Sequence, residues 1–250
     1  MHKLLVKNCQ NTDRMLKYGR QNAGVRFQAP WGKHSPESYR LRHWEPLSNG
    51  TDQSHFLPVV MTKDPYFWMQ SICRHAYTAK WNRTDLHCPN LVPNEFDKKH
   101  GFVLDEEHEA RLKKDGIPVT ISYNPNTTEY TNLAGAWNTW YGEHFDVDYP
   151  RLFVRFEDLL LHTETVVTQV CRCFGGKIID ETNFKFLASA SAKGAAGEHE
   201  GSAGLTEALL RYTNADKRLK SFTSEDLVFA NDHLNRSLMA MLHYASITLL

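Results

Sequence analysis

The sequence lacks several features that would each point to a particular class of protein. Its 29 Lys and Arg residues are balanced by 29 Asp and Glu residues, so the formal net charge is zero. A chain without a positive field is a poor candidate for general nucleic-acid binding, because that binding depends on neutralising phosphates. An anionic ligand would have to be held by a few placed cations and backbone amides. The charge balance therefore favours a small-molecule site and no nucleic-acid partner.

Long apolar runs are also absent. No stretch approaches the roughly 18 apolar residues needed to span a bilayer, so we expect no membrane span in these 250 residues. The N-terminal residues carry cations but no small-residue cleavage site, which argues against a signal peptide. Hydrophobic residues make up 41% and charged residues 23% of the chain. This composition is typical of a globular protein. The length allows one well-buried domain or at most two small ones, and we expect a single domain over residues 1–250.

The five cysteines do not have the spacing of metal ligands. Only two of them lie close together, the C-x-C pair Cys171 and Cys173, and no second pair is nearby. We therefore expect no metal site and interpret the thiols as free and buried. A bridge between Cys73 and Cys88 is the alternative if the chain occupies an oxidising compartment.

Four Asn-x-Ser/Thr triplets occur, and they begin at Asn49, Asn82, Asn126 and Asn235. Such triplets are the acceptors for N-linked glycans in proteins of the secretory pathway. They favour a glycoprotein in the Golgi lumen or another secretory compartment. The cytoplasm is the alternative, because the triplet also arises by chance.

Two short apolar runs, Phe56–Thr62 and Arg151–Phe156, predict buried strands, and each leads directly into a helix. Asp64-Pro65 follows the first run, where Asp can cap the free amides and Pro suits the first helical position. Glu157-Asp158 follows the second. We interpret these two acids as a helix cap with an ion pair to Arg155, because adjacent helical side chains face different ways and do not form an acid–base pair. The order of elements implies parallel strands joined by helical crossovers.

Helices are also predicted elsewhere from periodicity and capping signals. Residues 2–18 have the pattern of an amphipathic helix. Residues 131–145 predict another helix, in which Trp137 lies on a stripe typical of a protein core. Thr223 to Asp226 fits a capping box that begins the last helix or helix pair.

Two segments have a composition typical of loops. Residues 82–130 are polar and irregular, with one short helix near 106–114, and we expect them to form the acceptor side of a site. Residues 188–204 are rich in Ala, Gly and Ser, which predicts a mobile loop.

Three segments together resemble the sulfotransferase family. Residues 59–71 are similar to the family's 3′-phosphate-binding element, a strand that ends in Arg-Asp/Asn-Pro with a Ser eight residues after the Arg. Residues 152–160, LFVRFEDLL, are similar to its hallmark strand-to-helix turn. Residues 31–36, WGKHSP, resemble the short element that carries the catalytic base. The resemblance implies an α/β three-layer sandwich of the P-loop NTPase type, with a central parallel sheet flanked by helices.

The resemblance also implies a reaction and a co-substrate. Members of the family transfer a sulfuryl group from 3′-phosphoadenosine 5′-phosphosulfate to a hydroxyl or amine, which here would belong to a small-molecule or glycan acceptor. Lys63 and Ser71 match the positions that bind the 3′-phosphate, although the family usually has Arg in place of Lys63. Lys can bind phosphate as a point charge but without the bidentate geometry of Arg. Lys193 and Gly194 lie where the family often has a basic-Gly element that closes over the nucleotide. The alternative, which the composition of this segment favours, is a plain flexible loop.

Catalysis of sulfuryl transfer needs a base and stabilisation of oxygen charge. His34 is the candidate base, because a His with its ordinary pKa near ~6.5 can accept a proton at neutral pH. Lys33 is the candidate that stabilises the sulfuryl or bridging oxygen. The family places this Lys two residues before the His, whereas here it is adjacent.

One element of the family pattern is missing. No G-x-x-x-x-G-[K/T]-[S/T] run occurs, so the backbone amides that would hold the 5′-phosphosulfate are not identified. We interpret the chain as a fragment that lacks the first strand, the phosphate loop and any upstream membrane anchor, and we expect feeble transfer. The alternative is a non-catalytic relative that binds a nucleotide or glycan. A nucleotide kinase is a weaker reading, because no Walker lysine and no acidic Mg²⁺ ligand are identifiable.

Overall fold

The computed structural model describes residues 1–13, 25, 36–39, 56–84, 86–123, 126–187 and 205–247. These residues have a mixed α/β fold with small sheets, which confirms the α/β class. The chain divides into two compact units: the first unit is Met1–Lys63 with Val147–Thr213, and the second is Asp64–Asp146 with Asn214–Leu250.

Several predicted features lie outside the described residues. They are the candidate catalytic pair His34 and Lys33, the nucleotide-closing candidates Lys193 and Gly194, and the predicted loop 188–204. They stay predictions.

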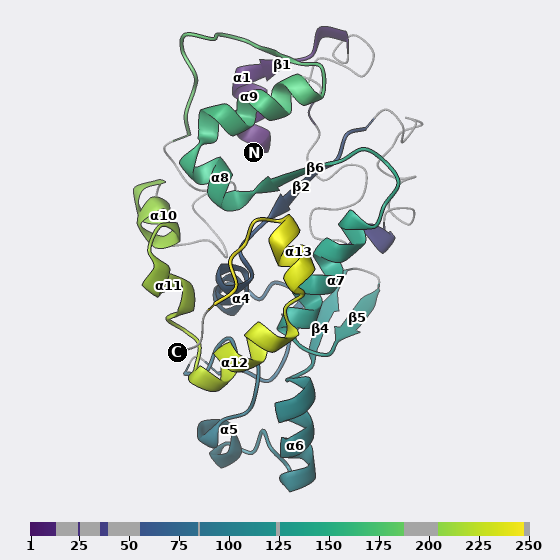
Figure 1. Ribbon diagram of the computed structural model, residues 1–250, viewed down its shortest axis with the longest axis vertical. Coiled ribbons are helices and arrows are strands. Elements are labelled where there is room, and N and C mark those ends of the chain that lie inside the picture. The colour runs from purple at the N-terminus through teal and green to yellow at the C-terminus, as the bar shows by residue number, and fades with distance from the viewer. Residues whose placement is uncertain are drawn as a thin grey trace. The chain divides into compact units, whose positions relative to one another are not determined.

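The first unit contains the predicted pair of parallel strands. β2 (Val59–Thr62) runs parallel to β6 (Leu152–Arg155), with Val59 opposite Leu152 and Thr62 opposite Arg155. Figure 1 shows α8 (Phe156–Leu161) directly after β6. Within the described residues the two strands form a two-stranded sheet. The parallel pairing is confirmed, and the wider three-layer sandwich stays a prediction.

Helices and a short antiparallel strand pair complete the core of the first unit. α1 (His2–Asn8) and α9 (Thr163–Cys173) pack together, and β1 (Cys9–Gln10) pairs antiparallel with β7 (Lys177–Ile178). The buried cluster draws on α1, β1, β6, α8 and α9 and comprises Leu4, Leu5, Cys9, Val154, Leu159, Val167, Val170 and Cys171. The unit also holds η2 (Glu37–Tyr39) and α10 (Leu205–Tyr212).

The structure corrects two predictions at the N-terminus. The helix predicted over 2–18 ends at Asn8, whose side chain donates to the Leu4 carbonyl at 2.9 Å and accepts from the Lys185 amide at 2.7 Å. Cys9 is extended and is joined to Cys171 by a disulfide. A second disulfide joins Cys73 to Cys88. The alternative bridge between Cys73 and Cys88 is therefore confirmed. The reading of buried free thiols is wrong, because four cysteines are paired and the fifth, Cys173, is free but exposed.

The second unit is mainly helical, with α4 (Pro65–Arg74), α7 (Leu133–Phe145), α11 (Ala215–Leu219), α12 (Ser224–His233) and α13 (Arg236–Met241). The predicted helices near 64–77 and 131–145 correspond to α4 and α7. Trp137 is fully buried, as its place on the predicted stripe indicated, and its ring packs against Tyr141 and Tyr244.

Residues 82–130 hold more regular structure than their polar composition indicated. β4 (Val119–Ser122) and β5 (Thr127–Tyr130) lie within this segment, and β3 (Ala79–Lys80) lies just before it. The three strands form an antiparallel sheet in the order β3-β4-β5. α5 (Glu95–Lys99) and α6 (Glu106–Asp115) precede β4, and α6 is the short helix predicted near 106–114. The acceptor-side role of this segment stays a prediction.

No helix in the described ranges combines the length and apolar character needed to cross a bilayer.

Candidate functional site

Lys63 lies at the carboxyl end of β2, where its ammonium faces two aromatic rings. Its Nζ is 5.2 Å from the ring centroid of Phe156 and 4.8 Å from that of Tyr212. The two rings pack edge to face with centroids 4.9 Å apart. A cation over aromatic faces is stabilised by about 0.5–2 kcal/mol. The Lys63 side chain is thereby held by residues of α8 and α10.

The register of the parallel pair explains why Lys63 and Phe156 meet. Thr62 is opposite Arg155, so the next residue of each strand leaves the same edge of the pair. Ligands of α/β proteins bind at the carboxyl ends of parallel strands. The two longest segments of the sulfotransferase resemblance, 59–71 and 152–160, thus begin on neighbouring strands, with Lys63 at the edge where such ligands bind.

The turn after β6 is stabilised by its own charges. Arg155 forms an ion pair with Asp158 across 3.7 Å, and Glu157 is buried. The predicted ion pair between Arg155 and this acidic pair is confirmed. Both acids lie in the first turn of α8, as predicted, but α8 has no side-chain capping hydrogen bond, so that part of the predicted cap is wrong.

The start of α4 is capped by Asp64, as predicted. Its Oδ1 accepts hydrogen bonds from the amides of Tyr66 at 3.0 Å and Phe67 at 3.2 Å, and its Oδ2 accepts from Arg218 at 2.8 Å. An anionic ligand therefore cannot use these two amides while the cap is formed. Cationic and hydroxyl side chains are left to bind it.

The Tyr66 phenol at the start of α4 cannot act as a general base. Its ring lies under the guanidinium of Arg218, 4.6 Å from the guanidinium carbon to the ring centroid. Burial raises the pKa of Tyr66 to about 12, and Asp64 acts in the same direction while Arg218 opposes it. The phenol stays protonated throughout the physiological range.

Ser71 lies two turns into α4, in the second unit, beside a cation. Its Oγ accepts a hydrogen bond from Nη2 of Arg74 at 3.2 Å. A hydroxyl and a guanidinium side by side can both donate to a phosphate oxygen. Sequence reasoning missed Arg74, although its position one turn after Ser71 could have indicated it. Convergence of Lys63, Ser71 and His34 on one anion stays a prediction.

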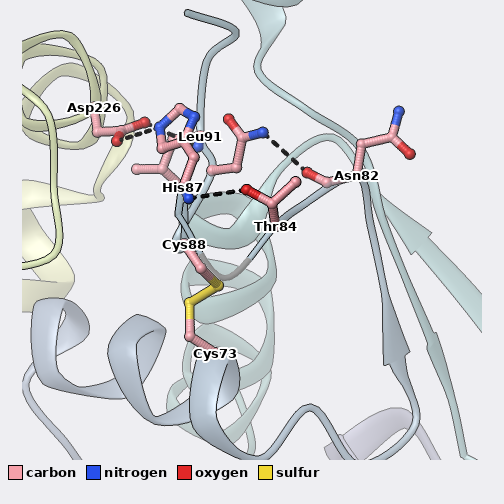
Figure 2. Close-up of a disulfide and its surroundings, with 8 residues drawn as sticks. Cys73, Asn82, Thr84, His87, Cys88, Leu91 and Asp226 are labelled. Atoms are coloured by element: carbon pink, nitrogen blue, oxygen red, sulfur yellow. Dashed lines mark hydrogen bonds and ion pairs between the residues drawn. A yellow bond between two sulfur atoms is a disulfide. The ribbon is translucent and has the colours of Figure 1, made fainter. Parts of the chain in front are cut away.

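The second unit also contains a buried charge cluster that no sequence motif indicated, and Figure 2 shows its members His87 and Asp226. His87 lies between two carboxylates, with its Nδ1 2.8 Å from Asp97 Oδ2 and its Nε2 2.9 Å from Asp226 Oδ2. The imidazole is 3% exposed and both carboxylates are fully buried. We call these three residues the Asp–His–Asp cluster.

The geometry of the cluster favours a protonated imidazole. A neutral imidazole can donate from one ring nitrogen only, whereas both nitrogens of His87 face carboxylates. Burial alone would lower the pKa of His87, but the hydrogen bonds and charges of Asp226 and Asp97 together raise it above the ordinary value. The imidazolium of His87 therefore forms ion pairs with both Asp97 and Asp226.

Both carboxylates of the cluster also begin helices. Asp97 completes the capping box of α5 with Asn94, and Asp226 completes that of α12 with Thr223. Asp226 additionally accepts from the amide of Leu91 at 2.9 Å. The predicted capping box at Thr223 is confirmed, and its acid ties α12 to His87. These partners support a structural role for the cluster, because each of its carboxylates already accepts hydrogen bonds from backbone amides.

No group of three or more His, Cys, Asp or Glu side chains in the described part of the chain is arranged to hold a metal ion. Comparison with known proteins found no matching family model, no matching curated protein and no matching solved structure.

Proposed function

We propose that this chain is a sulfotransferase-type domain that binds 3′-phosphoadenosine 5′-phosphosulfate and transfers its sulfuryl group to a hydroxyl or amine of a small molecule or glycan. One observation carries the proposal: the strands of segments 59–71 and 152–160 are neighbours, parallel and in register. Two motifs that are about ninety residues apart in sequence thus supply adjacent strand ends. The proposed fold is a three-layer α/β sandwich of the P-loop type, and such folds bind their nucleotide at the carboxyl ends of parallel strands.

The donor's 3′-phosphate is assigned to side chains, since Asp64 occupies the first amides of α4. In this proposal the ammonium of Lys63 supplies charge and the hydroxyl of Ser71 supplies a hydrogen bond. Phe156 and Tyr212 restrict the Lys63 side chain, which lowers the entropy lost on binding. Lys193 and Gly194 are assigned to closure over the nucleotide.

The chemical step is assigned to the pair in segment 31–36. His34 would take the proton of the acceptor's hydroxyl or amine as that group attacks sulfur. Lys33 would offset the negative charge that develops on the oxygen of the breaking sulfur–oxygen bond. No phosphate-loop run is present in the sequence, so transfer by residues 1–250 is expected to be weak.

A secretory compartment such as the Golgi lumen is the proposed location. The two disulfides support it, because disulfides persist in oxidising compartments and are rare in the cytosol. A glycan acceptor is consistent with that location.

A non-catalytic nucleotide- or glycan-binding protein is the second candidate. The lack of a phosphate-loop run favours it. Both candidates can bind the donor's nucleotide, so the labelled-sulfate assay described below separates them.

Binding of adenosine 3′,5′-bisphosphate, measured by calorimetry on residues 1–250, tests the donor site. Lys63→Ala should weaken binding by about ten- to hundred-fold, because a hydrogen bond to a charged group contributes roughly 1.5–3 kcal/mol. Ser71→Ala should weaken it by roughly five-fold, through loss of about 1 kcal/mol. Lys99→Ala is the matched control, since Lys99 is an exposed Lys of α5.

Unchanged affinity in Lys63→Ala, or no binding by the unaltered chain, would exclude this donor site. Transfer of labelled sulfate from the donor to a panel of hydroxyl and amine acceptors then separates the two candidates. Weak transfer that His34→Ala abolishes supports the enzyme, whereas binding without any transfer supports the non-catalytic protein.

A further inference from the structure

Asn82 begins the second of the four Asn-x-Ser/Thr triplets and is exposed. In Figure 2 its side-chain amide points away from His87 and from the Cys73–Cys88 disulfide. The residue is held through its main chain, because the Asn82 carbonyl accepts a hydrogen bond from the Asn90 side chain at 3.1 Å. Within the described residues, no hydrogen bond uses the Asn82 carboxamide.

The loop around Asn82 is ordered by groups other than that carboxamide. The Thr84 hydroxyl accepts from the His87 amide at 3.0 Å, and the Thr84 amide donates to the His87 carbonyl at 3.3 Å. Cys88 is joined to Cys73 at the end of α4. Arg83 stacks over the ring of Trp81 at 4.9 Å. A large group on the Asn82 amide would therefore break no described contact.

We propose that Asn82 carries an N-linked glycan. The donor would be an oligosaccharide joined through C1 to a lipid diphosphate. The Asn82 Nδ2 forms a bond to C1 and loses one proton, and the bond between C1 and the diphosphate oxygen breaks, so the lipid diphosphate leaves with the electron pair. The step needs no oxidant or reductant. It requires the lumen of the secretory pathway, which the two disulfides indicate independently of the triplet.

The other triplets are less suited to carry a glycan. The Asn235 side chain caps α13 by accepting from the Leu238 amide at 3.0 Å. Asn126 is half-buried next to β5, and Asn49 lies outside the described residues. Asn82 alone among the described three combines an exposed side chain with a carboxamide that makes no hydrogen bond within the described residues. The inference does not depend on the proposed sulfotransferase activity.

The test expresses the whole chain behind a secretory signal in a eukaryotic cell. The product is treated with an amidase that removes N-linked glycans in water enriched in heavy oxygen, and its peptides are analysed by mass spectrometry. Residue 82 should appear as labelled aspartate. An unlabelled asparagine at residue 82 in the secreted, disulfide-bonded protein would overturn the proposal.

Variants make the assignment specific to this triplet. Asn82→Gln should secrete normally and lose the label, and the protein should migrate faster by one glycan on a gel. Thr84→Ala should also lose it, whereas Thr84→Ser should keep both the glycan and the hydroxyl that accepts from His87. If Asn82→Gln does not secrete, the Thr84 variants decide: loss of the glycan in Thr84→Ala with its retention in Thr84→Ser supports the proposal. A secreted Thr84→Ser protein without a glycan at residue 82 contradicts it, because its triplet is intact.

Discussion

At the scale of single residues, the protonation of His87 determines how well the second unit is held together. Its imidazolium satisfies Asp97 and Asp226 at once, and both acids are fully buried. Loss of the proton leaves two buried carboxylates facing one remaining N–H. A buried charge without an opposite charge beside it is costly, so we expect the stability of the second unit to depend on pH.

The sign of this dependence follows from the pKa of His87, which the two acids raise above its ordinary value of 6.5. A raised pKa in the folded state adds stability that is complete below the unfolded pKa and is lost as pH rises through the folded pKa. The free energy of unfolding, measured with urea from mildly acidic to mildly alkaline pH, should therefore fall as pH increases above about 6.5.

Substitution of His87 should remove that dependence. His87→Gln should also lower the free energy of unfolding by roughly 3–5 kcal/mol at mildly acidic pH, because it leaves the two acids without their cation. His100→Gln, at an exposed His of the same unit, is the control and should change stability little. An unchanged slope of stability against pH in His87→Gln would show that the cluster is not the titrating group.

Single residues also show what could be predicted of the candidate site. The position of Lys63 at a strand end and the cap at Asp64 follow from local patterns, because a strand run and Asp-Pro are adjacent in sequence. The partners Phe156 and Tyr212 do not follow, since they depend on strand register and on a helix about 150 residues away. Asp226 was predicted as a helix cap, but its contact with His87 joins residues 139 positions apart.

At the scale of elements, β2 and β6 were predictable and the three-stranded sheet was not. The first two are short apolar runs followed by helix signals, and burial imposes that pattern. β3 has two residues, and β5 is the polar run Thr127–Tyr130. Such strands form because neighbouring segments offer backbone partners, and a local pattern of side chains does not report this.

The end of α6 depends on a glycine that no other residue should replace. Gly116 has φ +85° and ψ 175°, a region of backbone conformation that is almost exclusive to glycine. A Cβ on Gly116 would lie 2.6 Å from Phe229 Cζ and 2.7 Å from Asn132 Cβ. Gly116→Ala should therefore lower the free energy of unfolding by about 2–4 kcal/mol, through strain and overpacking together.

Gly101→Ala is the matched control for this substitution. Gly101 also has positive φ, +77°, but a Cβ there would meet no heavy atom within 4 Å. Its loss should be limited to about 1–2 kcal/mol of backbone strain. Equal losses for the two variants in urea unfolding would show that the contacts with Phe229 and Asn132 do not restrict residue 116.

At the scale of the whole molecule, the two disulfides restrict the chain over very different lengths. Cys73 and Cys88 are 15 residues apart, and Cys9 and Cys171 are 162 apart. In the chain-entropy description, such bridges stabilise a protein by about 3 and roughly 5 kcal/mol respectively, because they restrict the unfolded chain. The longer bridge joins the two sequence stretches of the first unit.

The cysteine pairing predicts a count of reactive thiols. The oxidised chain, unfolded in denaturant without reductant, should react with a thiol reagent at Cys173 alone, since the other four cysteines are paired. Reduction should raise the count to all five. The Cys173→Ser variant should give none before reduction. Three or more reactive thiols in the unreduced protein would contradict one of the bridges.

The second unit is assembled from two stretches of sequence, Asp64–Asp146 and Asn214–Leu250. A ribosome releases His87 and Asp97 well over a hundred residues before Asp226 emerges, so the nascent polypeptide holds an incomplete charge cluster for much of its synthesis. Over the same period the Leu91 amide lacks the Asp226 carboxylate, to which it donates a hydrogen bond in the folded protein. The second unit can therefore be completed only late in translation, when α12 and its residue Asp226 have been synthesised.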